Sequence, residues 1–307
     1  LDLERTWGSQ FAVTAFTNLT QDHLDYHKTF ESYFEAKARL FSKEYPSRRV
    51  ICIDDAWGAE LLRRCSAAED SVISTGFDPS AQIHPHKVEY FNTHTSVDLD
   101  VRGEHYRFDY PLVGRFNVSN VMLAFGIGLQ LGYPADVVAQ ALSEAPQIPG
   151  RLQRVQAAHD GGVSVYVDYA HTPDAVEKAV ASVKNITQGR TLVVFGCGGD
   201  RDAAKRPIMG KAALAGDFAV VTSDNPRTED PLAIIDDIVA GMGEGEGRFE
   251  VEPDRRAAIA KAISMAQPGD AVLIAGKGHE DYQLVGDKVL SFDDRVVAAE
   301  ELERAFS

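Results

Sequence analysis

The chain has 307 residues, 44% of them hydrophobic and 25% charged, which is the composition of a globular protein long enough for two domains. Its formal net charge of −15 argues against a nucleic-acid or anionic-membrane partner, because either one requires a basic face. The three cysteines have no CxxC spacing, which excludes a disulfide framework and a cysteine zinc site and favours a cytoplasmic protein. No stretch is long and apolar enough to span a membrane, so we expect no membrane insertion.

The first half of the chain mixes strand and helix patterns. Short apolar runs predict strands, alternating apolar and polar residues predict antiparallel strands, and helical spacing of apolar residues predicts helices. We expect strands over 11–16 and 50–53, antiparallel strands over 70–112, helices over 29–41 and 117–131, and a linker from Pro146 to Pro149.

The second half repeats strand, loop and helix, which predicts a mostly parallel, doubly wound α/β sheet. We expect strands over Val163–Val167, Thr191–Phe195, Phe218–Thr222 and Ala271–Ala275, and helices near 174–186, 205–215, 231–241, 254–266 and 293–306. Such sheets bind ligands at the carboxyl ends of their strands. Those ends carry polar clusters, which run from Asp168 to His171, Gly198 to Arg201, Asp224 to Arg227 and Gly276 to Glu280.

A lysine falls within the apolar stripe of the first predicted helix. On a helical wheel, Lys37 lies in the same stripe as Phe30, Phe34 and Phe41. A lysine that faces a core must extend to solvent, lose its charge or be chemically modified. Two interpretations stay open: a lysine that extends to water, and a functional lysine that faces a site.

Two histidines, His23 and His27, precede this helix and alternate with Asp22 and Asp25. This spacing could place both histidines on one helical face and bind a metal ion. The same pattern is typical of a solvated helix start, with Thr20 as its cap. The pattern by itself does not decide between them.

The glycine-rich segment from Phe195 to Arg201 follows a predicted strand, so a dinucleotide-binding loop must be considered. The G-x-G-x-x-G pattern requires glycine at the position of Arg201, where a bulky cation prevents close helix packing. The segment better suits a turn that presents an arginine to a carboxylate.

A second arginine, Arg227, ends the cluster after the next strand, and Glu280 ends the cluster after the last one. Guanidinium groups bind carboxylates through two parallel hydrogen bonds, and a glutamate can bind an ammonium group. These residue types together predict an amino-acid ligand. Alternatively, the three side chains pair with one another as an ion network.

Taken together, several segments resemble the Mur ligases, and within that family the members that add diaminopimelate. The resemblance runs in the family's order from residue 17 to residue 283, and DNPR with GKGHEDYQ is its most specific part. The segments are TNLTQDHLDYH, FEAKARLF, GRFNVSN, PGRLQRV, VYVDYAHTPDA, VFGCGGDRDAAKRP, SDNPRTEDP and AGKGHEDYQ.

The resemblance implies roles for individual residues. Lys37 matches a carbamylated lysine that, with the histidine matching His23, helps to hold Mg²⁺ near the phosphates of ATP. Arg227 of DNPR matches the residue that binds the second carboxylate of diaminopimelate, which lysine lacks. The other matches are Asn117, Asn120, Arg151 and Asp168 at the nucleotide; Arg201, Asp224, Asn225, Pro226, Gly276 and Glu280 at diaminopimelate; and Arg5 at the UDP-sugar substrate.

The family's organisation implies that residues 1–148 are the C-terminal portion of the central ATP-binding domain. Residues 149–307 would then form a Rossmann-like, amino-acid-binding domain. The implied activity is ATP-dependent addition of meso-diaminopimelate to UDP-N-acetylmuramoyl-dipeptide through an acyl phosphate, by a monomeric cytoplasmic enzyme. Alternatives are an acceptor such as L-lysine or D-glutamate, or a non-catalytic fragment that only binds diaminopimelate.

The sequence departs from the family pattern at three points. It lacks the phosphate-binding G-x-x-G-K-[ST] loop, since Gly210-Lys211 and Gly276-Lys277 have neither its spacing nor its hydroxyl residue. We expect that loop in a preceding part of a longer protein. Gln153 stands where relatives commonly have glutamate, and Leu3 stands where a polar residue that contacts the sugar is common. These two differences bear on the contacts with the sugar of the substrate.

Overall fold

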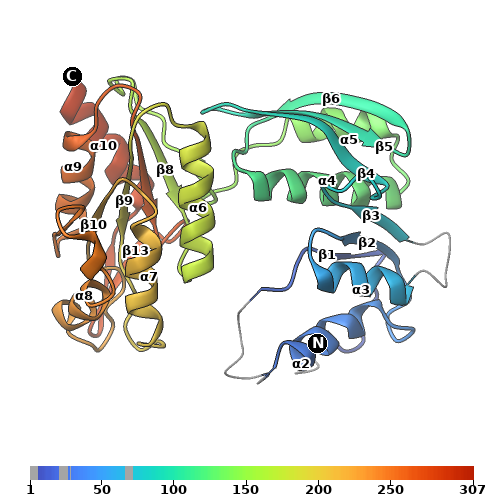
Figure 1. The fold of residues 1–307 in the computed structure, drawn as a ribbon, viewed down its shortest axis with the longest axis horizontal. Helices are drawn as coiled ribbons and strands as arrows, with labels where there is room; N and C mark the ends of the chain where they lie inside the picture. The colour runs from blue at the N-terminus through green and yellow to red at the C-terminus, as the bar shows by residue number, and fades with distance from the viewer. Residues whose placement is uncertain (1–5, 21–26, 28, 66–71) are drawn as a thin grey trace. The chain divides into compact units, whose positions relative to one another are not determined.

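The computed structural model of the chain describes residues 6–20, 27, 29–65 and 72–307. Contacts divide these residues into two compact units. The first unit comprises most of the chain up to Ala145. The second comprises Pro146–Ser307 with the short segments Tyr90–Thr93 and Leu112–Gly114. Figure 1 shows the elements of each unit.

The first unit is built on a six-stranded sheet in the order β1-β2-β3-β4-β5-β6. Strands β1, β2, β3 and β4 pair in parallel, whereas β5 and β6 are antiparallel. The strands are β1 (Val13–Phe16), β2 (Arg48–Cys52), β3 (Val72–Thr75), β4 (Ile83–Tyr90), β5 (Thr95–Val101) and β6 (Glu104–Tyr110).

The expectation of antiparallel strands over 70–112 is therefore confirmed for β5 with β6 and wrong for β3, which pairs in parallel with both β2 and β4. The reason is helix α3 (Ala56–Cys65), which the sequence reading did not predict. It connects β2 to β3 as a crossover, and such a connection makes the two strands parallel. All four residues of β3 are buried, as expected for a strand that is covered on both faces.

The helices of the first unit lie on both sides of β1, β2 and β3 (Figure 1). They are α2 (Phe30–Ala38) with the 3₁₀ turn η1 (Arg39–Phe41), α3, α4 (Arg115–Gln130) and α5 (Ala135–Ser143). Helix α2 begins where the hydroxyl of Thr29 accepts the N–H of Ser32, a side-chain cap. Its Phe34 is buried with Phe41 and Phe16 in one apolar cluster.

The second unit has the predicted doubly wound architecture. Its sheet has the order β11-β10-β9-β12-β8-β7, and every neighbouring pair is parallel except β7 with β8. The strands are β7 (Gln153–Arg154), β8 (Ser164–Asp168), β9 (Thr191–Phe195), β10 (Phe218–Val221), β11 (Phe249–Val251) and β12 (Ala271–Ala275). Strands β9 and β12 are buried along their whole length, which explains their uninterrupted apolar sequences.

Five helices cover this sheet (Figure 1): α6 (Pro173–Ile186), α7 (Lys205–Ala213), α8 (Pro231–Val239), α9 (Arg255–Met265) and α10 (Asp294–Phe306). Caps fix several starts. Thr172 and Asp230 each precede a proline at the first helical position and accept a backbone N–H. Asp254 and Asp293 cap α9 and α10 in the same way. The η2 turn (Gly243–Gly245) lies between α8 and β11.

Residues 282–291 form a β-hairpin, β13 (Tyr282–Val285) and β14 (Lys288–Ser291), that the sequence reading did not predict. The short edge strands β7 and β11 were also missed. These strands are two to four residues long and none of their residues is buried, so their sequences lack the pattern of a buried strand.

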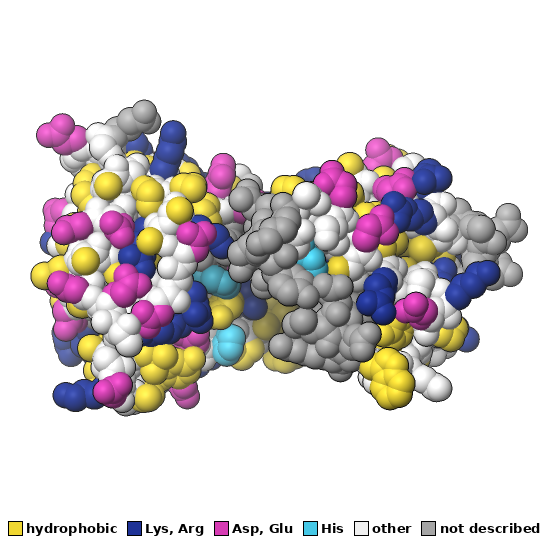
Figure 2. All heavy atoms as spheres, turned by 90° about the horizontal axis from the view of Figure 1, so that it is seen from below, with side chains coloured by type: hydrophobic (Ala, Val, Ile, Leu, Met, Phe, Trp, Pro, Cys, Tyr) yellow, Lys and Arg dark blue, Asp and Glu magenta, His cyan; other side chains and the backbone are white. Residues whose placement is uncertain are grey.

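None of the helices that the structure describes is long and apolar enough to cross a membrane. On the face shown in Figure 2, acidic and basic side chains are interspersed over the second unit.

Candidate functional site

Four polar clusters lie at the carboxyl ends of adjacent strands in the second unit. Strands β10, β9, β12 and β8 are neighbours in the sheet, and the clusters follow Val221, Phe195, Ala275 and Val167. The structure thus places the predicted ligand-binding segments of this unit along one edge of one sheet, the usual binding edge of this architecture.

The loops after β9 and β10 are joined by hydrogen bonds. The Gly199 N–H donates to the Asn225 carbonyl oxygen (2.9 Å), and Arg227 Nη1 donates to the Gly199 carbonyl oxygen (2.6 Å). The Thr228 hydroxyl donates to Asp200 Oδ1 (2.7 Å), which lowers the pKa of the Asp200 carboxyl group. The two loops therefore hold each other in place.

The side chains of Arg201 and Arg227 both pass beside Gly198. A methyl group at this glycine would lie 2.9 Å from Arg227 Nη1 and 3.8 Å from Arg201 Cγ. Arg227 is half-buried and Arg201 is exposed. At Gly199 a methyl group would lie 1.9 Å from the Pro226 carbonyl oxygen, so the close approach of the two loops requires glycine there.

Both loops contain a non-glycine residue in the left-handed region, Asp200 and Arg227, each with φ of 53°. Such a conformation costs about 1–3 kcal/mol and persists where surrounding contacts impose it. At Arg227 the contacts come from the β13–β14 hairpin, since its N–H donates to the Leu284 carbonyl oxygen (3.0 Å) and its carbonyl oxygen accepts the Gly286 N–H (2.6 Å). The hairpin thus sets the conformation of the DNPR arginine.

Glu280 is connected to the DNPR loop through Asn225. Asn225 Nδ2 donates to Glu280 Oε2 (2.9 Å), and Lys277 Nζ donates to Asn225 Oδ1 (3.1 Å) and lies 3.5 Å from Glu280 Oε2. The two arginines both lie beside Gly198, and the DNPR loop that carries Arg227 also binds Glu280. The alternative, in which Arg201, Arg227 and Glu280 pair directly with one another, finds no support in the contacts of the described residues.

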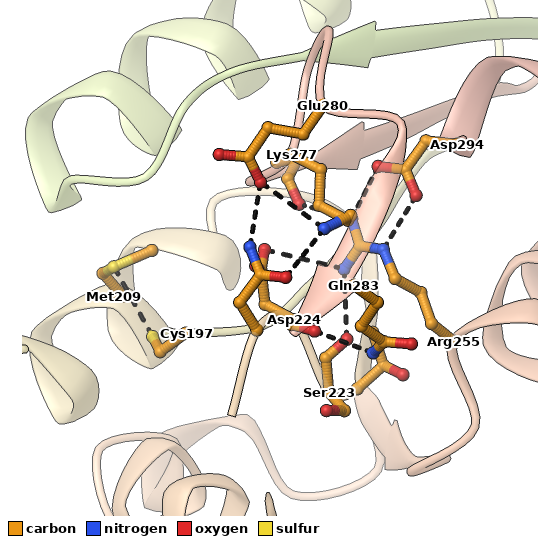
Figure 3. Close-up of polar contacts among 12 residues, drawn as sticks. Cys197, Met209, Ser223, Asp224, Arg255, Lys277, Glu280, Gln283 and Asp294 are labelled. Carbon is orange, nitrogen blue, oxygen red and sulfur yellow. Dashed lines mark hydrogen bonds and ion pairs between the residues drawn. The ribbon is translucent and has the colours of Figure 1, made fainter. Parts of the chain in front are cut away.

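A buried group of charges, Arg255, Asp294 and Asp224, lies near the Glu280 carboxylate (Figure 3). Arg255 donates to both carboxylate oxygens of Asp294 (2.8 and 2.7 Å) and lies 4.0 Å from Asp224. Burial raises the pKa of Asp224, and the neighbouring Arg255 and Lys277 oppose this rise. Gly276 has φ of 117°, and a methyl group on it would lie 2.5 Å from Asp224 Oδ2. Gly276 is therefore required by backbone conformation and by space.

The PGRLQ segment is held by Asp168 at the end of β8. The Asp168 carboxylate accepts the N–H groups of Leu152 (2.7 Å) and Ala170 (2.9 Å), while burial raises the pKa of Asp168. Leu152 has a positive φ of 41°, so this carboxylate stabilises a strained turn. The turn places the Arg151 guanidinium 4.9 Å from the centre of the Tyr169 ring.

This turn also contacts the GKGHE segment. A methyl group on Gly150 would lie 2.1 Å from the His279 backbone nitrogen, and one on Gly278 would lie 2.6 Å from Tyr169 Cβ. Three segments that the resemblance assigns to nucleotide and amino acid therefore pack backbone against backbone within the second unit.

The predicted site residues of the first unit are described by themselves. Lys37 is half-buried and its Nζ lies 4.9 Å from the centre of the Tyr33 ring, which stacks on His27. Lys37 therefore contacts an aromatic ring that packs against the apolar cluster of this unit. Asn117 is buried on α4 and accepts a hydrogen bond from Asn120 Nδ2 (3.2 Å).

His23, Arg5 and Leu3 lie outside the described residues. Within the described part of the chain, no group of three or more His, Cys, Asp or Glu side chains could hold a metal ion. Of the two predicted Mg²⁺ ligands, Lys37 lies among the described residues and His23 does not.

The sequence did not predict several residues that support the site through other residues. They are Lys277, Arg255, Asp294, Thr228 and Gln283, whose Nε2 donates to the Asp224 carbonyl oxygen (2.7 Å). One signal was available: Lys277 stands between two glycines directly after a fully buried strand, where a charged side chain has little access to water.

Family models match both halves of the chain. The Mur ligase middle domain matches residues 1–128, and the Mur ligase glutamate ligase domain matches residues 150–278. The chain belongs to the Mur ligase family. Its two matched regions are the middle and C-terminal domains of that family, in the family's order.

Among curated relatives, this Mur ligase chain is 48% identical over 303 residues to the UDP-N-acetylmuramoyl-L-alanyl-D-glutamate–2,6-diaminopimelate ligase of Gloeobacter violaceus. The match covers 98% of the chain and 61% of the relative. A solved structure of a ligase with the same name has a TM-score of 0.68 at 34% identity, covering 99% of this chain and 62% of that one.

The MurF ligase of Thermotoga maritima, solved in complex with ADP, has a TM-score of 0.66 at 17% identity, which shows a shared fold; the match covers 97% of this chain and 62% of that one. The chain thus spans about 61% of the length of the curated relative from Gloeobacter violaceus.

Proposed function

We propose that the chain is part of an ATP-dependent ligase that adds meso-diaminopimelate to UDP-N-acetylmuramoyl-L-alanyl-D-glutamate during peptidoglycan precursor synthesis. The observation that carries this proposal is that Arg201 and Arg227 both lie beside Gly198, with Glu280 bound to the same DNPR loop. The 48% identity to a ligase of that name supports it.

The charges of this site match those of the substrate. Diaminopimelate carries two carboxylates and two amines, one pair at each end of the molecule. Arginines bind carboxylates through paired N–H donors, and a carboxylate binds an ammonium group. Arg227 and Arg201 would bind carboxylate at the end of the molecule that does not react, and Glu280 would bind the ammonium group there. L-Lysine lacks that second carboxylate, so Arg227 would discriminate against it.

The proposed reaction proceeds in two steps. The terminal carboxylate of the UDP-linked dipeptide attacks the γ-phosphorus of ATP, giving an acyl phosphate and ADP. The neutral amine of diaminopimelate then attacks the acyl carbon, the amine loses a proton, and inorganic phosphate leaves. The protein would contribute chiefly by positioning the reactants and neutralising charge. Asn117, Asn120, Arg151 and Asp168 are proposed to line the nucleotide site, Asp168 through the turn that carries Arg151.

Mg²⁺ is proposed as the metal, with carbamylated Lys37 and His23 among its ligands. Arg5 is proposed to contact the UDP-sugar substrate. Bound Mg²⁺ would neutralise phosphate charge. The same proposal includes a domain boundary between residues 148 and 149 and a monomeric state. It also includes a cytoplasmic location, since ATP and a nucleotide-linked substrate are supplied in the cytoplasm.

The test is phosphate release by the full-length protein that contains this chain. Release should require ATP, the UDP-linked dipeptide and diaminopimelate together. Turnover with L-lysine that equals turnover with diaminopimelate would refute the proposed acceptor, and D-glutamate in the same assay would reveal a ligase for that residue.

A second function is favoured for the isolated chain, because both arginines and Glu280 belong to the second unit alone. The chain by itself would then bind diaminopimelate without catalysing a reaction. Calorimetric titration of the chain with diaminopimelate, and with L-lysine as the control, tests this binding.

A further inference from the structure

Lys277 is a buried cation that the proposed substrate contacts do not include. Its side chain has no exposed surface. A buried charge is tolerated only with polar partners. Its partners are Asn225 Oδ1 at 3.1 Å, Glu280 Oε2 at 3.5 Å and the face of the Tyr282 ring, whose centre is 5.5 Å away. Two of these three partners are residues proposed to touch diaminopimelate.

The contacts of Lys277 determine which way the Asn225 amide faces. Asn225 Oδ1 accepts from Lys277 Nζ and from the Leu284 N–H (2.9 Å), so both acceptor positions of this oxygen are used. A flipped amide would place an NH₂ group against these two donors. Asn225 Nδ2 is therefore directed to Glu280 Oε2.

The two carboxylate oxygens of Glu280 consequently differ. Oε2 accepts from Asn225 and lies beside Lys277, whereas Oε1 accepts no hydrogen bond from the part of the chain that the structure describes. The side chain of Glu280 is 18% exposed, so it is within reach of a ligand. Figure 3 shows Lys277 between Glu280 and the buried pair of Arg255 and Asp294.

We propose that Lys277 is a positioning residue of the amino-acid site: it holds Glu280 Oε2 and Asn225 Oδ1, which leaves Glu280 Oε1 for the substrate ammonium group. This inference rests on the proposed function and adds to it a residue that acts through Glu280. Arg255 provides the contrast, since it binds both oxygens of Asp294, which has no proposed contact with substrate.

The experiment is a double-mutant cycle in the full-length ligase with Lys277→Met, Glu280→Gln and the double variant. Lys277→Met should raise the KM for diaminopimelate at least tenfold and change the KM for ATP less than twofold. Because Lys277 acts through Glu280, the double variant should have the KM of Glu280→Gln alone, within twofold.

The matched control is Arg190→Met, which removes the partner of buried Asp270 (2.8 Å) at the opposite end of strands β9 and β12. This variant should lower the melting temperature and leave the KM for diaminopimelate unchanged. If Lys277→Met does not fold, Lys277→Gln enters the same cycle, since it keeps a donor and removes the charge.

Four outcomes decide the matter. A KM for diaminopimelate that Lys277→Met leaves unchanged, or effects of the two substitutions that multiply in the double variant, would overturn the positioning role while the proposed function stands. A wild-type enzyme without diaminopimelate-dependent turnover would overturn both. A raised KM that Glu280→Gln fully masks would establish the role.

Discussion

Replacing Arg227 by methionine should abolish the preference for diaminopimelate over L-lysine. Methionine keeps the apolar stem and the φ of 53°, so the strain of this position is the same in both proteins. What is lost is the guanidinium group, which donates to the Gly199 carbonyl oxygen and is proposed to bind the second carboxylate. The fold should survive because the backbone of Arg227 remains bound to Leu284 and Gly286.

The magnitude follows from the burial of the side chain. Removing one partner of a buried, hydrogen-bonded charge pair costs about 2–5 kcal/mol, and a half-buried arginine belongs at the lower end. A loss of roughly 2–3 kcal/mol corresponds to about a 30- to 150-fold decrease in kcat/KM for diaminopimelate. The assay is phosphate release by the full-length enzyme with each acceptor, and Arg227→Lys is the control that keeps the charge without the paired donors. An equal decrease in kcat/KM for L-lysine would refute the reasoning, because L-lysine has no second carboxylate for Arg227 to bind.

Three further predictions concern the same edge of the sheet. Gly198→Ala places a methyl group 2.9 Å from Arg227 Nη1, which is the end of a flexible side chain, so the KM for diaminopimelate should rise severalfold. The melting temperature should stay within a degree or two of wild type, which corresponds to about a few tenths of a kcal/mol of stability. A large loss of stability would contradict this prediction. Gly276→Ala combines φ of 117° with a contact to Asp224 Oδ2, so urea unfolding should show a loss of about 2–4 kcal/mol, and an unchanged midpoint would refute the packing argument. Because burial raises the pKa of Asp224, the folded protein holds this proton more tightly than the unfolded chain, so the contribution of Asp224 to stability is greatest at low pH and is lost as pH rises through its folded-state pKa. Asp224→Asn should therefore flatten the fall in melting temperature above the ordinary pKa of aspartate, and an unaltered pH profile would count against it.

The local sequence predicted the central strands β8, β9, β10 and β12 of the second unit because they are mostly apolar runs separated by helices. The expected strands at 191–195 and 271–275 agree with β9 and β12 residue for residue. In the first unit the prediction of antiparallel strands failed at β3, because the crossover helix α3 was not recognised. The helical wheel placed Lys37 beside apolar residues, and in the structure its Nζ lies 4.9 Å from the centre of the Tyr33 ring, which packs against the apolar cluster.

The site residues were found as separate segments, and the resemblance to a family supplied their roles. Their mutual contacts could not be predicted, since they join residues far apart in the chain. Arg227 binds Gly199 across 28 positions, and Asn225 binds Glu280 across 55. The hairpin β13–β14, which sets the conformation of Arg227, has too few buried residues to leave a strand pattern.

The sequence by itself determined the α/β alternation, the polar clusters after each strand and the residue types suited to an amino acid with two carboxylates, because these depend on side-chain chemistry and on periods of a few residues. The tertiary structure decided the strand order that brings the clusters together, the placement of two arginines beside Gly198 and the burial of Lys277 beside Glu280. Those features arise from hydrogen bonds and packing between distant segments, and the surroundings of each residue exist only after the sheet has formed.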